Sequence, residues 1–149
     1  MPSMLPPTNI NEIAHVIQLA IAPVFLLTAV GTIIAVLTNR LSRVIDRIRV
    51  LEERLALIDA AQLQRANDEL ELLARRMRLI YIAVASAVFC ALFVGLLIVL
   101  AFIDAFMSIN LAKMVGLMFV LAMFAFIFAL VVFLREIFLA VVATRKAMK

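Results

Sequence analysis

Side chains that could perform chemistry are few in this sequence, and none falls into a catalytic or metal-binding pattern. His15 is the single histidine and Cys90 the single cysteine, so neither a disulfide within the chain nor a thiolate metal cluster can form. The four serines lack the setting of a nucleophile elbow or a lysine dyad, and no glycine-rich phosphate loop is present. The sequence therefore predicts neither an enzyme nor a protein with a cofactor.

Polar side chains instead recur at helical spacing along the first hydrophobic block. Projected at about 100° per residue, they share one broad face that is interrupted by Ile21, Phe25 and Val36; its polar members are Asn11, His15, Gln18, Thr28, Thr32, Asn39 and Arg43. We call the candidate pore-lining part of this face the polar stripe; it comprises Gln18, Phe25, Thr28, Thr32, Val36, Asn39 and Arg43. Because lipid solvates such a face poorly, it should look toward protein or water. Either it packs on other helices of the chain, with Thr hydroxyls bonding back to helix carbonyls, or copies of this helix surround a pore. In the pore interpretation, Phe25 or Val36 forms a hydrophobic constriction, and Arg43 and Arg47 ring the cytoplasmic mouth.

Two further features of the hydrophobic blocks bear on packing and movement. Pro23 removes one helical hydrogen bond in mid-membrane and is a candidate for either a structural bend or a gating hinge. Small residues recur at every fourth position, at Gly31 and Ala35 in the first block and at Ala83, Ala87, Ala91 and Gly95 in the second. Such series let helices approach closely in lipid, and their partner is either within the chain or in another copy.

The elements that position these residues follow from composition. The sequence is 67% hydrophobic and 16% charged, against roughly 45 to 50% apolar residues in soluble domains. Three blocks, 13–38, 79–103 and 114–134, contain no Asp, Glu, Lys or Arg, and each reaches the ~20 residues that a helix needs to cross a bilayer. Only helices satisfy their own backbone in lipid, so the sequence predicts an all-α membrane protein with three transmembrane helices.

Basic residues predict the orientation. Nine arginines lie within 39–78, and four basic residues follow the third block, whereas only Lys113 lies between the second and third blocks. Under the positive-inside bias, the long loop and the C-terminus are cytoplasmic and the N-terminus is outside. The +4 net charge is explained by this topology, so no nucleic-acid partner is expected.

The long loop is itself helical in pattern. Apolar residues follow a three-four spacing in two seams, with no Gly or Pro between Gly31 and Gly95 to stop a helix, and the reversal is predicted within 59–67. The first two transmembrane helices therefore extend into an antiparallel, coiled-coil-like hairpin. The predicted organisation is an outer tail (1–11), a transmembrane helix (12–38), the cytoplasmic hairpin (39–78), a second transmembrane helix (79–103), an outer turn (104–113), a third transmembrane helix (114–134) and a basic cytoplasmic tail (135–149).

Residues 18–27 (QLAIAPVFLL), 39–49 (NRLSRVIDRIR) and 51–54 (LEER) resemble a family of bacterial membrane proteins known as domain of unknown function 2721. The resemblance extends from about His15 to Arg135 and Glu136. It implies a three-span protein of the bacterial cytoplasmic (inner) membrane and brings no activity that can be assigned to a residue.

Two functional hypotheses follow. In the first, the protein is a homo-oligomeric ion channel or small-solute pore lined by the first helix. In the second, it is a membrane-anchored structural or interaction protein whose cytoplasmic hairpin docks a partner. Lipid is the expected surrounding in both, and four arginines at the membrane edge are candidates for contact with anionic headgroups: Arg40, Arg76, Arg78 and Arg135.

Overall fold

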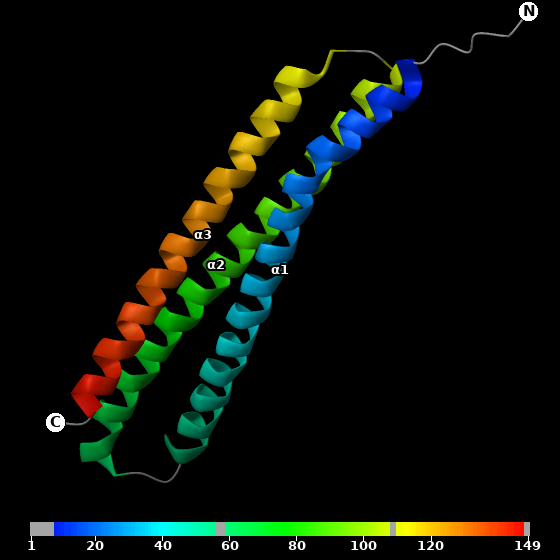
Figure 1. Cartoon of the computed structure of the whole chain (residues 1–149). Coiled ribbons are helices and arrows are strands. Elements are labelled where there is room, and N and C mark those ends of the chain that lie inside the picture. Colours follow the sequence, from blue (N-terminus) through cyan, green and yellow to red (C-terminus); the bar gives the residue numbers. More distant parts are fainter. Residues whose placement is uncertain (1–7, 56–58, 108–109, 148–149) are drawn as a thin grey trace, which may run out of the picture.

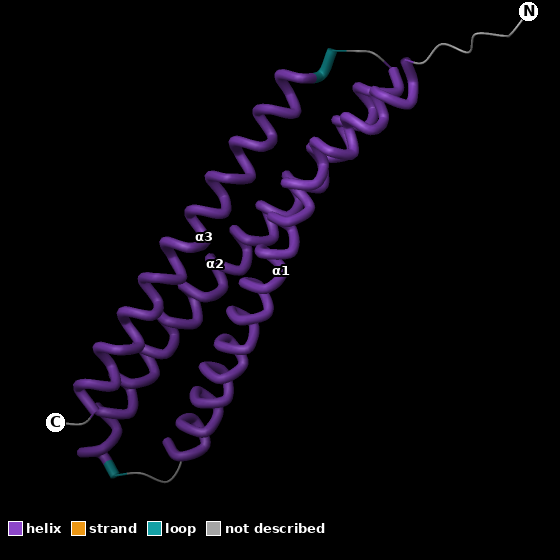
Figure 2. The backbone as a smooth tube through the Cα atoms, in the orientation of Figure 1, coloured by secondary structure: helices purple, strands orange, loops and turns teal. Residues whose placement is uncertain are grey.

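The computed structural model describes residues 8–55, 59–107 and 110–147. In this part of the chain all regular structure is helical, in three long helices: α1 (Thr8–Leu55), α2 (Ala60–Met107) and α3 (Ala112–Ala147). Figures 1 and 2 show them as an elongated bundle whose neighbours run antiparallel. All three are long and apolar enough to cross a membrane, which confirms the prediction of an all-α chain with three helices able to span a bilayer.

The helices run well past the charge-free blocks. α1 and α2 have 48 residues each, about 72 Å at helical rise, because the chain offers no Gly or Pro that would end them at the membrane edge. α3 also continues to Ala147, so the predicted basic tail is helical over most of its length. It too lacks a helix breaker between Arg135 and Ala147.

The reversal between α1 and α2 lies earlier than the end of the predicted window. α1 ends at Leu55 and α2 has begun by Ala60, so Asn67 lies inside a helix instead of capping one. Asp59 directly precedes α2, and its carbonyl accepts the backbone N–H groups of Gln62 and Leu63 at 2.9 and 3.1 Å. An N-cap residue makes this first helical bond.

α2 is the shared partner in the bundle. α1 and α3 each pack along it, while α1 and α3 contact each other much less. Buried residues recur at seven-residue intervals on each helix: Val30, Leu37, Val44 and Leu51 on α1, Ala66, Leu73, Ile80, Ala87 and Val94 on α2, and Ala122, Ala129 and Glu136 on α3. This interval keeps one face of a long helix turned toward its neighbour, and it leaves the opposite face of α1 uncovered.

The turn between α2 and α3 is short. The backbone N–H of Leu111 donates to Oδ1 of Asp104 at 2.7 Å, and Asn110 has a φ of 52°. Asn is among the few residues that adopt this left-handed conformation readily. The two ends of this turn are thereby tied together at the end of the bundle opposite the arginines.

Candidate functional site

The structure brings charged side chains from all three helices together at one carboxylate. Glu136 of α3 is fully buried and accepts a hydrogen bond on Oε2 from Nη1 of Arg40 on α1. Its Oε1 accepts from Nε and Nη2 of Arg76 on α2, at 3.2 and 2.9 Å. One acidic residue therefore links the three helices.

Charge balance explains why this arrangement tolerates burial. A buried carboxylate is costly unless it is paired and hydrogen-bonded, and both oxygens of Glu136 have a guanidinium partner. The side chains of Arg40 and Arg76 remain 32% and 22% exposed, so the excess positive charge keeps access to polar surroundings. Arg40 also lies 5.3 Å from the ring centre of Phe133, within the range of a cation–π contact.

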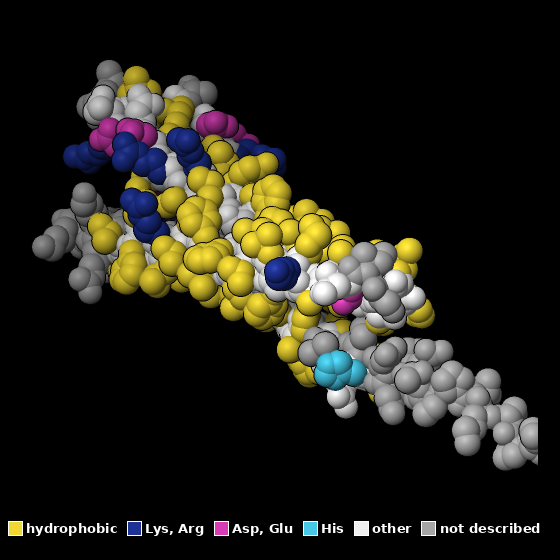
Figure 3. All heavy atoms as spheres, turned by 90° about the horizontal axis from the view of Figure 1, so that it is seen from above, with side chains coloured by type: hydrophobic (Ala, Val, Ile, Leu, Met, Phe, Trp, Pro, Cys, Tyr) yellow, Lys and Arg dark blue, Asp and Glu magenta, His cyan; other side chains and the backbone are white. Residues whose placement is uncertain are grey.

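This cluster lies where the chain would leave the hydrocarbon. At a rise of about 1.5 Å per residue, α3 covers about 33 Å between Lys113 and Arg135, close to the ~30 Å of a bilayer's apolar core. Figure 3 shows most of the charged side chains gathered toward one end of the molecule and hydrophobic side chains over its middle. We call this level the arginine belt; it comprises Arg40, Arg76, Arg78, Arg135 and Glu136.

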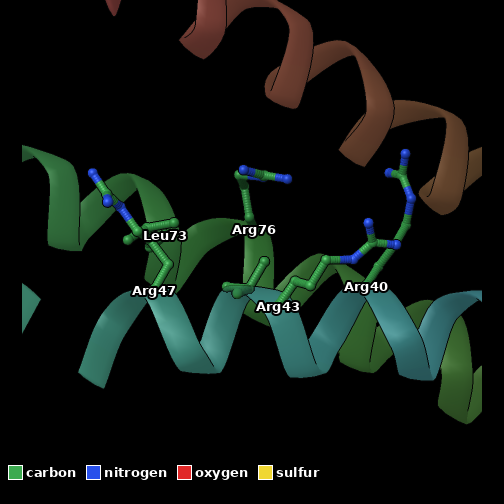
Figure 4. A pocket seen from close by; sticks show the side chains of 6 residues that line it. Arg40, Arg43, Arg47, Leu73 and Arg76 are labelled. Carbon is green, nitrogen blue, oxygen red and sulfur yellow. The ribbon is translucent and has the colours of Figure 1, made fainter. Parts of the chain in front are cut away.

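A pocket of about 230 Å³ opens between α1 and α2 beside Glu136, lined by Arg40, Arg43, Val44, Arg47, Leu73 and Arg76. Figure 4 shows Arg40, Arg43 and Arg47 spaced along α1, with Arg76 and Leu73 on α2 beside them. Arg47 pairs with Glu69 through Nε and Nη2, at 3.0 and 2.8 Å. Arg43 donates to the carbonyl of Asn39 at 3.4 Å and has no acidic partner in the described ranges. Four guanidiniums thus meet two carboxylates, and such an excess attracts anions.

The polar stripe lies on the uncovered side of α1. Gln18, Thr28, Thr32 and Asn39 are all exposed, and Phe25 is 72% exposed. Val36 and Arg43 are exposed as well. The stripe therefore does not pack on α2 or α3, which rules out the interpretation that other helices of the same chain cover it.

The stripe's threonines do make the predicted back-bonds. The hydroxyl of Thr28 donates to the carbonyl of Val24 at 3.3 Å, and that of Thr32 to the carbonyl of Thr28 at 3.0 Å. The side-chain amides of Gln18 and Asn39 make no such bond in the described structure. The back-bonds lower the cost of exposing the hydroxyls in lipid, while the amides still need water or protein.

The small residues divide between two environments. Ala83 and Ala87 of α2 are buried and Ala91 is half-buried, so these three residues pack within the chain. Gly95 is half-buried, but a Cβ added there would meet nothing within 4 Å. Gly31 and Ala35 on α1 are exposed, and a Cβ added at Gly31 would meet nothing within 4 Å. The α1 series therefore has no neighbour in the chain.

Pro23, the candidate hinge, lies within the continuous helix α1 and is buried. It occupies the same seven-residue series as Val30 and Leu37. Its packing is that of a core residue, and whether the helix bends there in use stays a prediction.

The four predicted headgroup arginines also divide. Arg40 and Arg76 are held by Glu136, whereas Arg78 and Arg135 are exposed and form no ion pair or hydrogen bond in the described ranges. Headgroup contact stays a prediction for all four, and the structure gives the two pairs different surroundings.

Glu136 is the site residue that sequence reasoning missed. It is the first acidic residue after Asp104 and follows the buried Ala122 and Ala129 at seven-residue spacing. That spacing is a signal that the residue faces the bundle. Among the residues whose side chains are described, no group of three or more His, Cys, Asp or Glu could hold a metal ion.

Comparison with known proteins gives one finding. The model of a family described as "Protein of unknown function (DUF2721)" matches residues 20–146, which confirms the resemblance inferred from the sequence. Searches of the curated proteins and of the solved structures found no match.

Proposed function

We propose that this chain, which belongs to the DUF2721 family, forms a homo-oligomer in which copies of α1 line a path for ions or small solutes. The observation that carries the proposal is the polar stripe on the side of α1 that faces neither α2 nor α3. In a single copy this side would face lipid. In a ring of copies it faces water.

A water-filled axis satisfies the groups that the single chain leaves unsatisfied. The amides of Gln18 and Asn39 gain water as a partner, and the back-bonded hydroxyls of Thr28 and Thr32 keep lone pairs that can accept from it. The exposed ring of Phe25 lies between these polar positions and forms the constriction, since hydrophobic rings gate by dewetting.

Contact between neighbouring copies is provided by the exposed small residues. Gly31 and Ala35 flank the stripe on α1 and are exposed, so another helix can approach the backbone there. In lipid, close backbone approach is a main source of helix association. A closed ring uses one such contact per subunit and leaves no free end.

The arginine-lined pocket sets the charge preference of this path. Arg43 is the last residue of the stripe and also lines the pocket between α1 and α2, where four guanidiniums meet only two carboxylates. Arg47 lines the same pocket and is paired with Glu69 of α2. Basic rings at a mouth raise the local concentration of anions. We therefore expect anions to pass in preference to cations.

The experiment is a flux assay on the full chain in liposomes, with chloride and potassium compared. Phe25→Ala should raise the flux by widening the constriction, and Arg43→Gln should lower the chloride preference. Phe124→Ala on α3 is the matched control, because Phe124 is similarly exposed at 68% but lies on another helix. No flux under voltage, pH steps or membrane tension, or equal effects of Phe25→Ala and Phe124→Ala, would remove the proposal.

The proposed orientation places the arginine belt on the cytoplasmic side of a bacterial inner membrane, with the N-terminus outside, as the positive-inside bias predicts. Single cysteines introduced by Arg65→Cys and Lys113→Cys in a Cys90→Ala background would report it. A membrane-impermeant maleimide added to intact cells should label only the second. Labelling of the first instead would reverse the topology.

A second candidate function rests on the length of the helices. α1 and α2 continue for about 23 Å beyond the belt, and they share a core there that includes Val44, Leu51, Ala66 and Leu73. That is more helix than spanning requires, and it fits a coiled-coil-like hairpin that docks a cytoplasmic partner. Crosslinking in native membranes discriminates, because a specific soluble partner that is captured in the absence of flux would favour anchoring.

A further inference from the structure

A second basic groove lies between α2 and α3, apart from the pocket between α1 and α2. It has a volume of about 390 Å³ and is lined by Arg75, Arg78, Leu79, Ile82, Arg135 and Leu139. Half of these residues are arginines and half are large and apolar. We call this feature the α2–α3 groove; a ligand that fills it must carry both negative charge and apolar surface.

Two of the three guanidiniums that line the groove have no hydrogen-bond or ion-pair partner in the described structure. Arg75 is paired with Glu71 one turn away, through Nη2 and Oε1 at 2.7 Å. Arg78 and Arg135 are exposed and form no ion pair or hydrogen bond in the described structure. No Asp or Glu lines the groove, so its positive charge is not neutralised from within.

The two arginines stand at the same height in the bundle, on opposite walls of the groove. Arg76 contacts Glu136 directly, and Arg78 and Arg135 are the near neighbours of these two residues in sequence. Arg78 is the last charged residue before the uncharged stretch of α2, and Arg135 the first after that of α3. The groove therefore straddles the level at which hydrocarbon gives way to headgroups.

On the α2 wall, the apolar lining continues from this level toward the membrane interior, whereas Leu139 of α3 lies one helical turn beyond Arg135 in the opposite direction. Leu79 follows Arg78 directly, and Ile82 lies one helical turn further along α2. A ligand held by the two arginines would thus have its remaining length directed along an apolar wall into the bilayer.

We propose that the α2–α3 groove binds one anionic phospholipid of the surrounding membrane. Its phosphate lies between the guanidiniums of Arg78 and Arg135, and an acyl chain lies against Leu79 and Ile82. Guanidinium groups bind phosphate oxygens through paired, charge-assisted hydrogen bonds. A zwitterionic headgroup is disfavoured, because its cation would find three arginines and no carboxylate along the lining.

The test is lipid binding by the full chain in detergent, read by native mass spectrometry during titration with phosphatidylglycerol or phosphatidylcholine. We expect one phosphatidylglycerol to bind at least about tenfold more tightly than phosphatidylcholine. The double variant Arg78→Gln/Arg135→Gln should lose this preference. The measurement needs no flux, so it can fail or succeed independently of the channel proposal.

A charge-matched control separates a site from general attraction. Arg49 and Arg65 are exposed, lie outside the groove and form no ion pair or hydrogen bond in the described ranges, so Arg49→Gln/Arg65→Gln removes the same charge. If this control weakened binding as much as the groove variant does, the lipid would be held by net charge alone and the proposal would fail.

A second arm separates a lipid from a free anion. Glycerol phosphate carries the headgroup phosphate without acyl chains and should not displace bound phosphatidylglycerol at equal concentration. Equal competition would make the groove a site for soluble phosphate compounds and overturn the lipid assignment. An unchanged melting temperature of the groove variant in lipid-free detergent shows that any loss of binding is not a loss of fold.

Discussion

Two sets of arginines lie at one height on different sides of α2, and their surroundings differ. Arg40 and Arg76 converge on the buried Glu136, which closes the contact between the three helices. Arg78 and Arg135 flank a groove without an acid, and their guanidiniums are open to other partners. In the sequence alone, all four arginines are equivalent candidates for contact with lipid headgroups. The difference is made by one carboxylate on α3.

The two sets of arginines differ in whether a buried carboxylate needs them as counter-charges. Glu136 has no exposed surface and must have counter-charges from its own chain. Arg78 and Arg135 neutralise no buried charge, so replacing them should leave the fold intact. Variants at the two sets therefore differ first in stability and then in binding.

The largest effect is expected from Arg40→Gln/Arg76→Gln. Both cationic partners of Glu136 disappear, and an orphaned buried charge costs about 3 to 5 kcal/mol of unfolding free energy. Denaturant titration in detergent micelles measures it. The groove variant Arg78→Gln/Arg135→Gln, with the same loss of charge, is the control, and equal destabilisation of the two would contradict the distinction.

Glu136→Gln should cost less, about 1 to 3 kcal/mol, because Arg40 and Arg76 are partly exposed and can turn toward water or headgroups. In the Arg40→Gln/Arg76→Gln background, the same change should restore stability, since it removes the orphaned charge. A double-mutant cycle on the unfolding free energy reads this coupling. Additive losses would mean that the three side chains do not act as one unit.

Arg76→Lys keeps the positive charge and changes only the hydrogen-bond geometry at Glu136, so it tests whether that geometry stabilises the fold. The two bonds from Nε and Nη2 to Oε1 become one bond from an ammonium group, for a loss of about 1 kcal/mol. Arg78→Lys should change the midpoint of thermal unfolding little, because Arg78 has no partner in the described structure. A larger shift for Arg78→Lys than for Arg76→Lys would reverse the assignment.

The smallest effect on stability is expected from Arg78→Gln/Arg135→Gln, within about 0.5 kcal/mol in lipid-free detergent. Added phosphatidylglycerol should raise the unfolding midpoint of the wild-type chain, because a ligand of the folded state stabilises it. The variant should show a reduced rise. An identical rise in both would show that the lipid acts elsewhere on the protein.

Much of the fold could be predicted because hydrocarbon permits few solutions. An uncharged block of sufficient length must be a helix, and the absence of Gly and Pro between Gly31 and Gly95 predicts that α1 passes the membrane edge unbroken. The three-four spacing of Leu41, Val44 and Leu51 likewise puts these residues on one side of the helix. Periodicity gives angles around one helix, however, and does not say which neighbour stands at which angle. The sequence therefore does not predict which neighbour the polar stripe faces.

The Glu136 cluster could not be predicted because its partners lie far away in the sequence. Arg76 precedes Glu136 by 60 residues and Arg40 by 96, and only the packing of α1 and α3 on α2 brings them together. In the sequence, Glu136 adjoins Arg135, which invites the interpretation of a solvated tail. Its seven-residue spacing from Ala129 was the one local indication that it faces inward.

The uninterrupted course of α1 has a mechanical consequence. The segment that ends at Leu55 and the segment that carries the polar stripe belong to one rod with a single hydrogen-bonded backbone. A tilt or axial rotation imposed on the end at Leu55 therefore moves Thr28 and Thr32 as well. The ion pair between Arg40 and Glu136 is the point at which α1 is held to α3 during such a movement. A force on the segment of α1 beyond the arginine belt is thus transmitted to the segment that carries the polar stripe.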